Sequence, residues 1–315
     1  MKQHLQTGTH MRNKKYQGVI VPMVTPFTPD NRIDLGAAEL VADHLVANGA
    51  QPFILGTTGE SSSIPDELRL PFVERVVQAV RGRTLAYAGI AANCLSTSVN
   101  LARQYFAAGV DVVVAHLPNY YPLKPYQMQQ YIESLADQIP GPIILYNIPK
   151  TTHHSIPLEI IDKVSHHPNL VGLKDSERNL SRLDESIARW ENRNDFSFLI
   201  GWAAQSLYGL SRGADGIVPS TGNIRPDLYV TLFNAVMEHD LNTAEQVQNI
   251  THDLSLIYQK DLELGESIAA LKVIMNALGL CSEVVLPPLA QLPTDVRQRI
   301  KGQIEKSEWL QKRSA

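Results

Sequence analysis

A lysine stands at the end of a short apolar run, where its amine could do covalent chemistry. The run Leu170–Lys174 has the composition of a buried β-strand. If its residues alternate, Val171 and Leu173 face the surrounding helices and Lys174 faces the interior. Burial disfavours the ammonium ion and lowers its pKa, which leaves the neutral amine that a Schiff base requires. A structural lysine that pairs with a carboxylate, or one that reaches solvent at the rim, fits the same pattern.

A tyrosine ends the preceding apolar run, Pro142–Asn147. It precedes Lys174 by about one strand and one helix, so Tyr146 is expected to point inward beside the lysine. A phenol in that place can move a proton while an imine forms. The alternative is a core aromatic residue whose hydroxyl has an ordinary partner.

A loop of small polar residues, Gly56-Thr57-Thr58-Gly59-Glu60, follows another apolar run. Its two glycines allow a tight turn that exposes amide N–H groups beside the two threonine hydroxyls. Such a nest suits a carboxylate or a phosphate. The loop lacks the Gly-Lys-Ser/Thr ending of a Walker motif and the spacing of a dinucleotide fingerprint.

The scaffold for these residues is predicted from eight short runs rich in β-branched residues, with helical patterns between them. The runs are Gly18–Thr25, Pro52–Gly56, Thr84–Gly89, Asp111–Leu117, Pro142–Asn147, Leu170–Lys174, Phe196–Gly201 and Gly216–Ser220. Continuously apolar strands that alternate with helices are typical of a parallel sheet covered on both faces. Eight such units predict an α/β fold, a (β/α)8 TIM barrel whose active site lies after the carboxyl ends of the strands.

The rest of the chain is predicted to be helical. Amphipathic patterns cover Pro226–His239, Ala244–Leu262, Ser267–Leu280 and Asp295–Lys312. We expect a barrel over residues 17–225 and C-terminal helices over 226–315 packed on it in the same domain. Residues 1–16 are polar and basic and are predicted to form a flexible arm, and a tag remnant before a native start at Met11 is the alternative interpretation.

Composition excludes several classes of protein. Of the 315 residues, 44% are apolar and 19% charged, which is enough for a large core, and the net charge of −4 comes with no basic stripe for a nucleic acid. The sequence contains no run of about eighteen apolar residues, so no membrane span is predicted. Cys94 and Cys281 cannot form a disulfide framework and suit a reducing cytoplasm. No histidine–carboxylate spacing indicates a metal site, so no cofactor is expected.

The three motifs together resemble the dihydrodipicolinate synthase/N-acetylneuraminate lyase family of class I pyruvate-dependent aldolases. The similarity runs from about Gly18 to Leu289 and is carried by Gly56–Glu60, Tyr146–Pro149 and Gly172–Asp175. The resemblance implies an imine on Lys174 and proton transfer by Tyr146, with Thr57 linked to it in a relay. It also implies that Gly56, Thr57, Thr58 and Gly59 hold the carboxylate of pyruvate.

A further segment, Pro118-Asn119-Tyr120-Tyr121, resembles the part of the family that lends a tyrosine to a neighbouring subunit's site. Tyr120 is the matching position and Tyr121 the second choice. The resemblance therefore implies a homo-oligomer, a dimer of dimers. The alternative is an ordinary aromatic residue at the rim.

Departures from the family pattern bear on the substrate. The family's synthases have an arginine where this chain has Thr151, which cannot grip a second carboxylate with two parallel bonds. The sialic-acid lyases have an acidic pair where this chain has Ala203 and Ala204, which cannot bind a polyol. The residues left to surround a substrate are Thr151, Thr152, Ser176, Trp202, Val218 and Ser220. His153-His154 also replaces a stretch where the family commonly has glycine.

The favoured function is therefore a lysine Schiff-base lyase that cleaves or forms a 2-oxo acid, a 2-keto-3-deoxy sugar acid or a smaller aldehyde adduct of pyruvate. A sugar-acid dehydratase that keeps the same imine is the alternative. A dihydrodipicolinate synthase proper is disfavoured by Thr151. A carboxylate-binding barrel without catalysis and a metal-dependent aldolase are the other classes considered.

Overall fold

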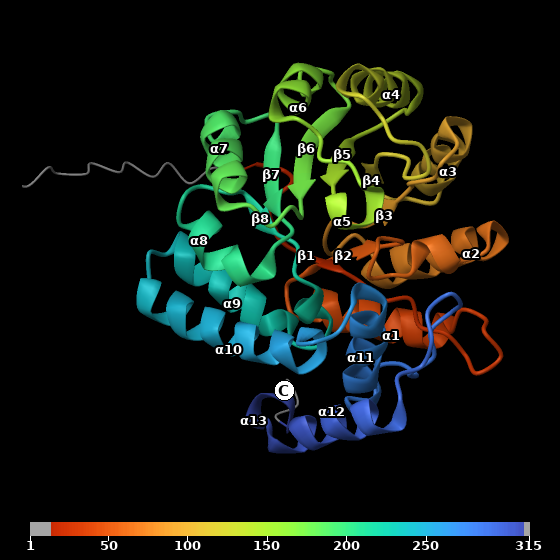
Figure 1. Ribbon diagram of the computed structural model, residues 1–315, viewed down its shortest axis with the longest axis vertical. Helices are drawn as coiled ribbons and strands as arrows, with labels where there is room; N and C mark the ends of the chain where they lie inside the picture. The colour runs from red at the N-terminus through yellow and green to blue at the C-terminus, as the bar shows by residue number, and fades with distance from the viewer. Residues whose placement is uncertain (1–13, 312–315) are drawn as a thin grey trace, which may run out of the picture.

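Eight parallel strands form a closed barrel at the centre of the molecule. The computed structural model describes residues 14–311 (Figure 1). The strands are β1 Gly18–Pro22, β2 Gln51–Ile54, β3 Tyr87–Gly89, β4 Val112–His116, β5 Ile143–Asn147, β6 Leu170–Asp175, β7 Ser197–Ile200 and β8 Gly216–Ile217. They pair in chain order, and β8 pairs with β1 to close the ring. The predicted (β/α)8 TIM barrel is confirmed.

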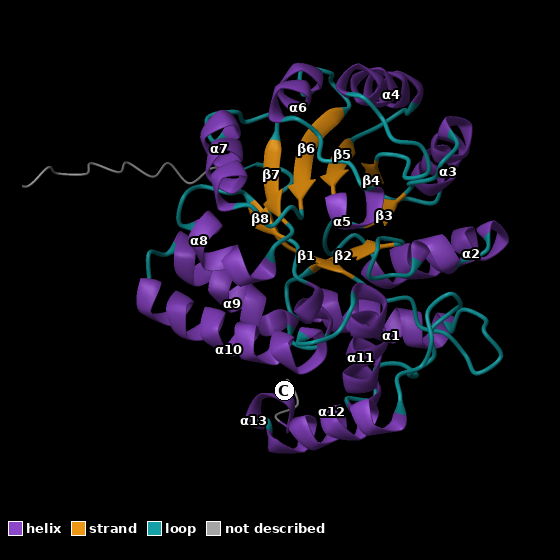
Figure 2. Cartoon of the chain, in the orientation of Figure 1, coloured by secondary structure: helices purple, strands orange, loops and turns teal. Residues whose placement is uncertain are grey.

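Helices surround the strands and extend beyond them on one side (Figure 2). The barrel helices are α1 Leu35–Ala47, α2 Asp66–Val80, α3 Leu95–Ala107, α4 Pro125–Gln138, α5 Pro149–Thr152, α6 Leu158–Val164, α7 Leu180–Trp190, α8 Ser206–Leu210 and α9 Pro226–Met237. The remaining helices are α10 Leu241–Gln259, α11 Leu264–Ala277, α12 Thr294–Lys306 and α13 Glu308–Gln311. The expected barrel boundary at residue 225 leaves out α9, yet α9 packs against β1 and supplies the last barrel helix. None of the helices within residues 14–311 is long and apolar enough to cross a membrane.

The core has two layers, because side chains along each strand alternate between two faces. In β4, Val112 and Val114 belong to a cluster inside the barrel, whereas Val113 and Ala115 pack outward against the helices. The inner cluster is small and consists of residues from most of the strands. Side chains thus fill the barrel, and sites of this fold form at its carboxyl-terminal mouth.

The alternation in β6 is interrupted by a bulge. Ile143 of β5 pairs with Leu170, but the next residue, Ile144, pairs with Gly172, so Val171 is left out of the ladder. Val171 therefore packs against the inner cluster, and the prediction that it faces the helices is wrong. An extra residue in one strand disrupts the alternation locally. The alternation resumes beyond the bulge, and the lysine at the end of β6 faces inward as expected.

The arm that the sequence predicts over residues 1–16 lies outside the described residues as far as position 13. Lys14, however, is only 4% exposed, and its Nζ lies 2.8 Å from Oδ2 of Asp215 and 2.9 Å from the carbonyl oxygen of Phe196. These partners precede β8 and β7, so the ammonium group of Lys14 joins the amino ends of two strands. The arm boundary at residue 16 is therefore wrong, because position 14 already belongs to the fold.

We expect Lys14→Met to lower the free energy of unfolding by about 2 kcal/mol, because it removes the buried ammonium group that pairs with the carboxylate of Asp215. The backbone N–H of Phe198 still donates to that carboxylate, which limits the loss. The adjacent Lys15 is exposed, so Lys15→Met is a matched control that should change the free energy by less than about 0.5 kcal/mol. Urea unfolding measures both. Equal effects of the two variants would contradict the structural role of Lys14.

Candidate active site

Neighbouring strands place a row of side chains in one layer at the mouth of the barrel. The strand register pairs His116 of β4 with Tyr146 of β5, and Tyr146 with Lys174 of β6. All three residues lie at or near the carboxyl ends of their strands, where sites of this fold are formed. The lysine and the tyrosine that the sequence selected are thus brought together.

Lys174 is buried in apolar surroundings. Its Nζ lies 3.8 Å from the centroid of the Tyr146 ring and 4.8 Å from that of Phe53, and the residue is 4% exposed. Within residues 14–311 no carboxylate forms an ion pair with it, and it does not reach solvent at the rim. Burial lowers the pKa of Lys174, and the nearby Tyr146 hydroxyl only partly opposes this effect. The structural alternatives for this lysine are therefore wrong.

Tyr146 separates Lys174 from His116. The residue is 5% exposed, and its ring meets that of His116 edge to face, with centroids 6.3 Å apart and an angle of 68° between the planes. The phenol is close enough to Lys174 for its hydroxyl to act on the pKa of the amine. A hydroxyl so placed can give a proton to, or take one from, an atom bonded to that amine.

The Gly56–Glu60 loop follows β2 and turns at the mouth of the barrel. The amide of Glu60 donates to the carbonyl oxygen of Thr57 at 3.1 Å, and Thr57 and Thr58 are half-buried. The left-handed residues of the turn are Leu55 and Glu60, both with φ of 55°. Neither Gly56 nor Gly59 has a positive φ, so the tight turn does not depend on a left-handed glycine.

The glycines of this loop are needed for space. A Cβ at Gly56 would lie 2.9 Å from the Phe53 ring, and one at Gly59 would lie 3.0 Å from the carbonyl oxygen of Met23. The backbone of the loop thus packs directly on the barrel. This close packing leaves the half-buried threonines as the side chains of the loop that a ligand can reach.

A buried ion pair that the sequence did not reveal anchors this loop. Nζ of Lys272 in α11 lies 2.5 Å from Oε1 of Glu60, and both side chains are fully buried. The same lysine donates to the carbonyl oxygen of Val284 at 2.8 Å, and Oε2 of Glu60 accepts from the amide of Leu286 at 2.9 Å. The C-terminal helices therefore help to hold the loop that the sequence predicts to bind a carboxylate.

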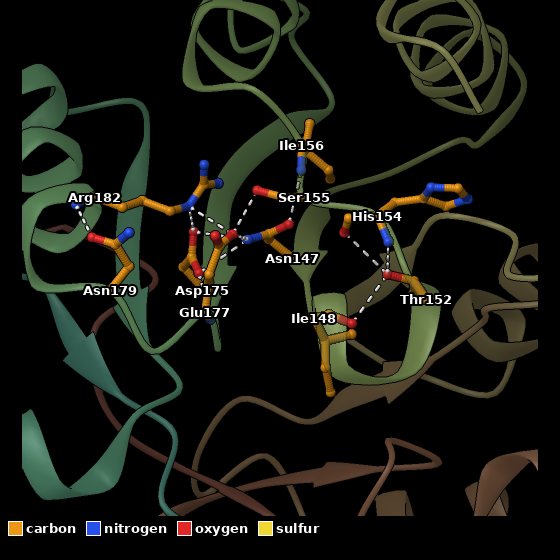
Figure 3. Close-up of polar contacts among 10 residues, drawn as sticks. All are labelled: Asn147, Ile148, Thr152, His154, Ser155, Ile156, Asp175, Glu177, Asn179 and Arg182. Carbon is orange, nitrogen blue, oxygen red and sulfur yellow. Dashed lines mark hydrogen bonds and ion pairs between the residues drawn. The ribbon is translucent and has the colours of Figure 1, made fainter. Parts of the chain in front are cut away.

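A second network includes Asn147 and Asp175, the residues that follow Tyr146 and Lys174 in the chain (Figure 3). Asn147 pairs in register with Asp175, and its Nδ2 donates to Oδ1 of Asp175 at 3.1 Å and to Oε2 of Glu177 at 3.0 Å. Nε of Arg182 donates to Oδ2 of Asp175 at 2.8 Å. Burial raises the pKa of Asp175, whereas Arg182 opposes that rise. Each catalytic candidate thus has a sequence neighbour in a network that joins β5, β6 and α7.

The same network holds the loop after β5. The amide of Ile156 donates to Oδ1 of Asn147 at 3.0 Å, and the hydroxyl of Ser155 donates to Oε2 of Glu177 at 2.6 Å (Figure 3). His153 adopts a left-handed φ of 61°. That angle suits the glycine that is common in the resembled family at this stretch. The turn at His153 is therefore left-handed although a histidine occupies it in place of a glycine.

The threonines of α5 differ in how they are exposed. Thr152 is buried, and its hydroxyl donates to the carbonyl oxygen of Ile148 at 3.0 Å (Figure 3). Thr151 is half-buried, with a longer contact of 3.4 Å to the same oxygen. Of the two, Thr151 is the more available to a ligand.

The other residues expected around the substrate do not all line the interior of the barrel. Val218 belongs to the inner cluster, as expected of a pocket wall. Ser176 is half-buried and packs so closely on Gly201 that a Cβ there would lie 2.0 Å from its Oγ. Trp202 instead packs against the outer cluster, and it lines a small depression with Asp175 and other polar residues. The expected contact of Trp202 with a ligand in the barrel is therefore not supported.

The hydroxyl of Ser220 is already engaged. Its Oγ lies 2.7 Å from the hydroxyl of Tyr258 in α10, and that phenol also lies 2.9 Å from Oγ1 of Thr221. The sequence pointed to Ser220 but not to its helical partner, which lies far along the chain. A ligand that binds Ser220 has to share it with Tyr258.

Tyr120 does not join the layer of Lys174 in its own chain. It is 75% exposed and packs edge to face on Tyr121, which is 70% exposed. The prediction that it completes a neighbouring subunit's site stays a prediction.

Two inward residues were missed although a simple signal marks them. His116 and Phe53 obey the same strand alternation that placed Lys174 in the interior. Histidine and phenylalanine in apolar strands are usually core residues, so the residue types alone did not mark either as a candidate for the site. Counting inward positions on every strand would have found both.

The chain has known relatives over nearly its whole length. The model of the dihydrodipicolinate synthetase family matches residues 15–307. A probable 2-dehydro-3-deoxy-D-pentonate aldolase of Escherichia coli is 29% identical over 91% of this chain and 96% of its own length. A 4-hydroxy-tetrahydrodipicolinate synthase of Gluconacetobacter diazotrophicus is 30% identical, with 92% and 97% covered. The dihydrodipicolinate synthase structure from Bacteroides thetaiotaomicron superimposes with a TM-score of 0.88 at 29% identity, covering 94% of this chain and 100% of its own.

Proposed function

This chain belongs to the dihydrodipicolinate synthetase family, and we propose that it cleaves a 2-oxo acid to pyruvate and an aldehyde through a Schiff base on Lys174. The observation that carries the proposal is the amine itself, which is buried against two aromatic rings and has no carboxylate partner among residues 14–311. Keeping a lysine in such a place costs stability, because a charged amine loses its hydration there. A catalytic role explains why the lysine is kept there, because the same burial favours the neutral amine that attacks a ketone.

In the proposed reaction Lys174 forms the covalent bond, Tyr146 transfers the proton, and the loop of Thr57 and Thr58 binds the carboxylate. Lys174 Nζ adds to the keto carbon C2, and loss of water leaves an imine. The C3–C4 bond then breaks, its electron pair moves into an enamine, and the proton of the C4 hydroxyl leaves through Tyr146. The enamine takes up a proton at C3, and water releases pyruvate from the lysine. The amides and hydroxyls of Thr57 and Thr58 hold the carboxylate.

The aldehyde half of the substrate is proposed from the residues that could bind it. Thr151 offers a hydroxyl and no charge, which favours an uncharged, hydroxylated group over a second carboxylate. The relative in Escherichia coli that is named as a probable pentonate aldolase fits this choice. We therefore propose a 2-keto-3-deoxy sugar acid as the substrate class.

The test is reduction with borohydride in the presence of pyruvate, followed by mass spectrometry of the peptide that contains Lys174. We expect one reduced pyruvate adduct on that lysine, and a pH profile for its formation that lies below that of an exposed lysine, because burial lowers the pKa of the amine. Absence of a covalent adduct would leave only a binding function. Incubation with 2-keto-3-deoxy acids then separates the reactions. Free pyruvate indicates cleavage, whereas an oxo acid that keeps all its carbons indicates dehydration.

We also propose that the chain works as a homo-oligomer in which Tyr120 enters a neighbouring site. The support is the exposure of Tyr120 and Tyr121 on a bend after β4, near the mouth of the barrel. Aromatic side chains that are this exposed are enriched in protein interfaces.

A further inference from the structure

A histidine lies in the layer of the catalytic candidates and has no role in the reaction proposed above. His116 ends β4 in the inward register of Val112 and Val114. It pairs with Tyr146, and its ring meets the Tyr146 ring edge to face. The imidazole therefore lies one strand beyond the tyrosine and two strands beyond Lys174.

The hydrogen bonding of His116 leaves one nitrogen as an acceptor. Nδ1 lies 2.7 Å from the carbonyl oxygen of Leu117. A carbonyl oxygen can only accept, so Nδ1 carries the hydrogen and a neutral imidazole has its lone pair on Nε2. Burial lowers the pKa of His116, and the hydrogen bond to the carbonyl oxygen of Leu117 only partly opposes this effect. No group within residues 14–311 forms a hydrogen bond with Nε2, which is not sealed from solvent.

The order of these residues across the barrel matches the order of atoms along the substrate. The imine fixes C2 at Lys174, and the hydroxyl on C4 meets Tyr146 on the next strand. Adjacent strands lie about 4.8 Å apart. A further step of one strand reaches His116, where the part of the substrate beyond C4 must lie. That part leaves as the aldehyde.

We propose that His116 determines specificity, because its Nε2 accepts a hydrogen bond from a hydroxyl on the aldehyde half of the substrate, beyond the bond that breaks. The inference rests on the lyase function proposed above and adds the substrate group that His116 recognises, a hydroxyl on the aldehyde half. A site that offers an acceptor to a hydroxyl discriminates against the analogue without it, because the acceptor then loses its water and gains no partner. The protein should therefore prefer adducts of pyruvate with hydroxylated aldehydes.

The test compares two substrates that share one carbon chain. 2-Dehydro-3-deoxypentonate and 4-hydroxy-2-oxopentanoate differ only in the hydroxyl on C5, and cleavage of either gives pyruvate. Both C4 stereoisomers of each are assayed. We expect the unsubstituted protein to prefer the pentonate in kcat/KM. His116→Phe keeps an aromatic ring and removes the acceptor, and it should lower the ratio of the two kcat/KM values about tenfold. His116→Gln keeps an acceptor and should restore part of the ratio.

Controls separate this inference from the function on which it rests. Borohydride trapping with pyruvate involves no aldehyde half, so a failure there in the unsubstituted protein rejects the lyase function itself. His252→Phe changes an exposed histidine of α10 and should leave the substrate ratio unchanged. Equal loss of both activities in His116→Phe would mean that the imidazole merely supports Tyr146, and it would overturn the proposal. No preference in the unsubstituted protein would overturn it as well.

Discussion

Lys174→Met is expected to abolish pyruvate release, with a fall in kcat of at least about 10⁴-fold, and to remove the borohydride adduct. Methionine has a similar length and no nucleophile, so the imine cannot form, while the carboxylate-binding loop is untouched. Turnover with each variant is measured from pyruvate release, and the adduct by mass spectrometry. Lys163→Met, which replaces a lysine on the exposed side of α6, is the matched control and should keep full activity. An adduct in the Lys174→Met protein would show that another amine is the nucleophile.

The stability of the same variant provides a second readout. Because no carboxylate in the described residues pairs with Lys174, its loss leaves no orphaned charge. An apolar side chain in the buried position should keep or raise the free energy of unfolding. A protein that becomes inactive but no less stable would distinguish a functional lysine from a structural one.

Lys272→Met is expected to have the largest effect on stability, a loss of about 3–5 kcal/mol in the free energy of unfolding. The substitution leaves the carboxylate of Glu60 buried without its ion-pair partner. Burial lowers the pKa of Lys272, whereas Glu60 raises it, so the two groups depend on each other. Glu60 also closes the loop of Thr57 and Thr58, so we expect borohydride trapping to need a higher concentration of pyruvate in any protein that still folds. Denaturant unfolding and trapping rates measure the two effects.

The control for this prediction is another pair of the same residue types at the surface. Nζ of Lys150 lies 3.2 Å from Glu263, but the side chains are 66% and 83% exposed. Lys150→Met should therefore cost less than about 1 kcal/mol. The double variant Lys272→Met with Glu60→Gln removes both buried charges and should be more stable than Lys272→Met alone. A double variant as unstable as the single one would show that packing, and not the orphaned charge, dominates.

The barrel was predictable because its physical signature is local. Strands buried on both faces read as short apolar runs, and each of the eight runs overlaps a strand of the structure. Strand ends were less accurate: the run Gly216–Ser220 contains only a two-residue strand, Gly216–Ile217, because a 3-10 turn begins at Ser220. Backbone hydrogen bonds with neighbours decide where a strand ends, and those neighbours are distant in the chain.

The catalytic candidates were predictable for a related reason. Lys174 and Tyr146 end successive strands, and parallel pairing brings such positions side by side. The side that each residue faces was less certain. Because of the bulge in β6, the side chain of Val171 faces inward and not outward, and the residues Leu170–Lys174 give no sign of a bulge.

Residue types and strand periodicity are properties of neighbouring positions, and they were enough to indicate a barrel, a nucleophile and a proton carrier. Partners that stabilise the site come from remote parts of the chain. Glu60 meets Leu286 across 226 positions, and Ser220 meets Tyr258 across 38. Whether a buried charge is neutralised depends on every group that folding brings around it. Among the described residues, Lys174 has no countercharge and Lys272 has one, and this contrast arises only when the barrel closes and the C-terminal helices pack on it.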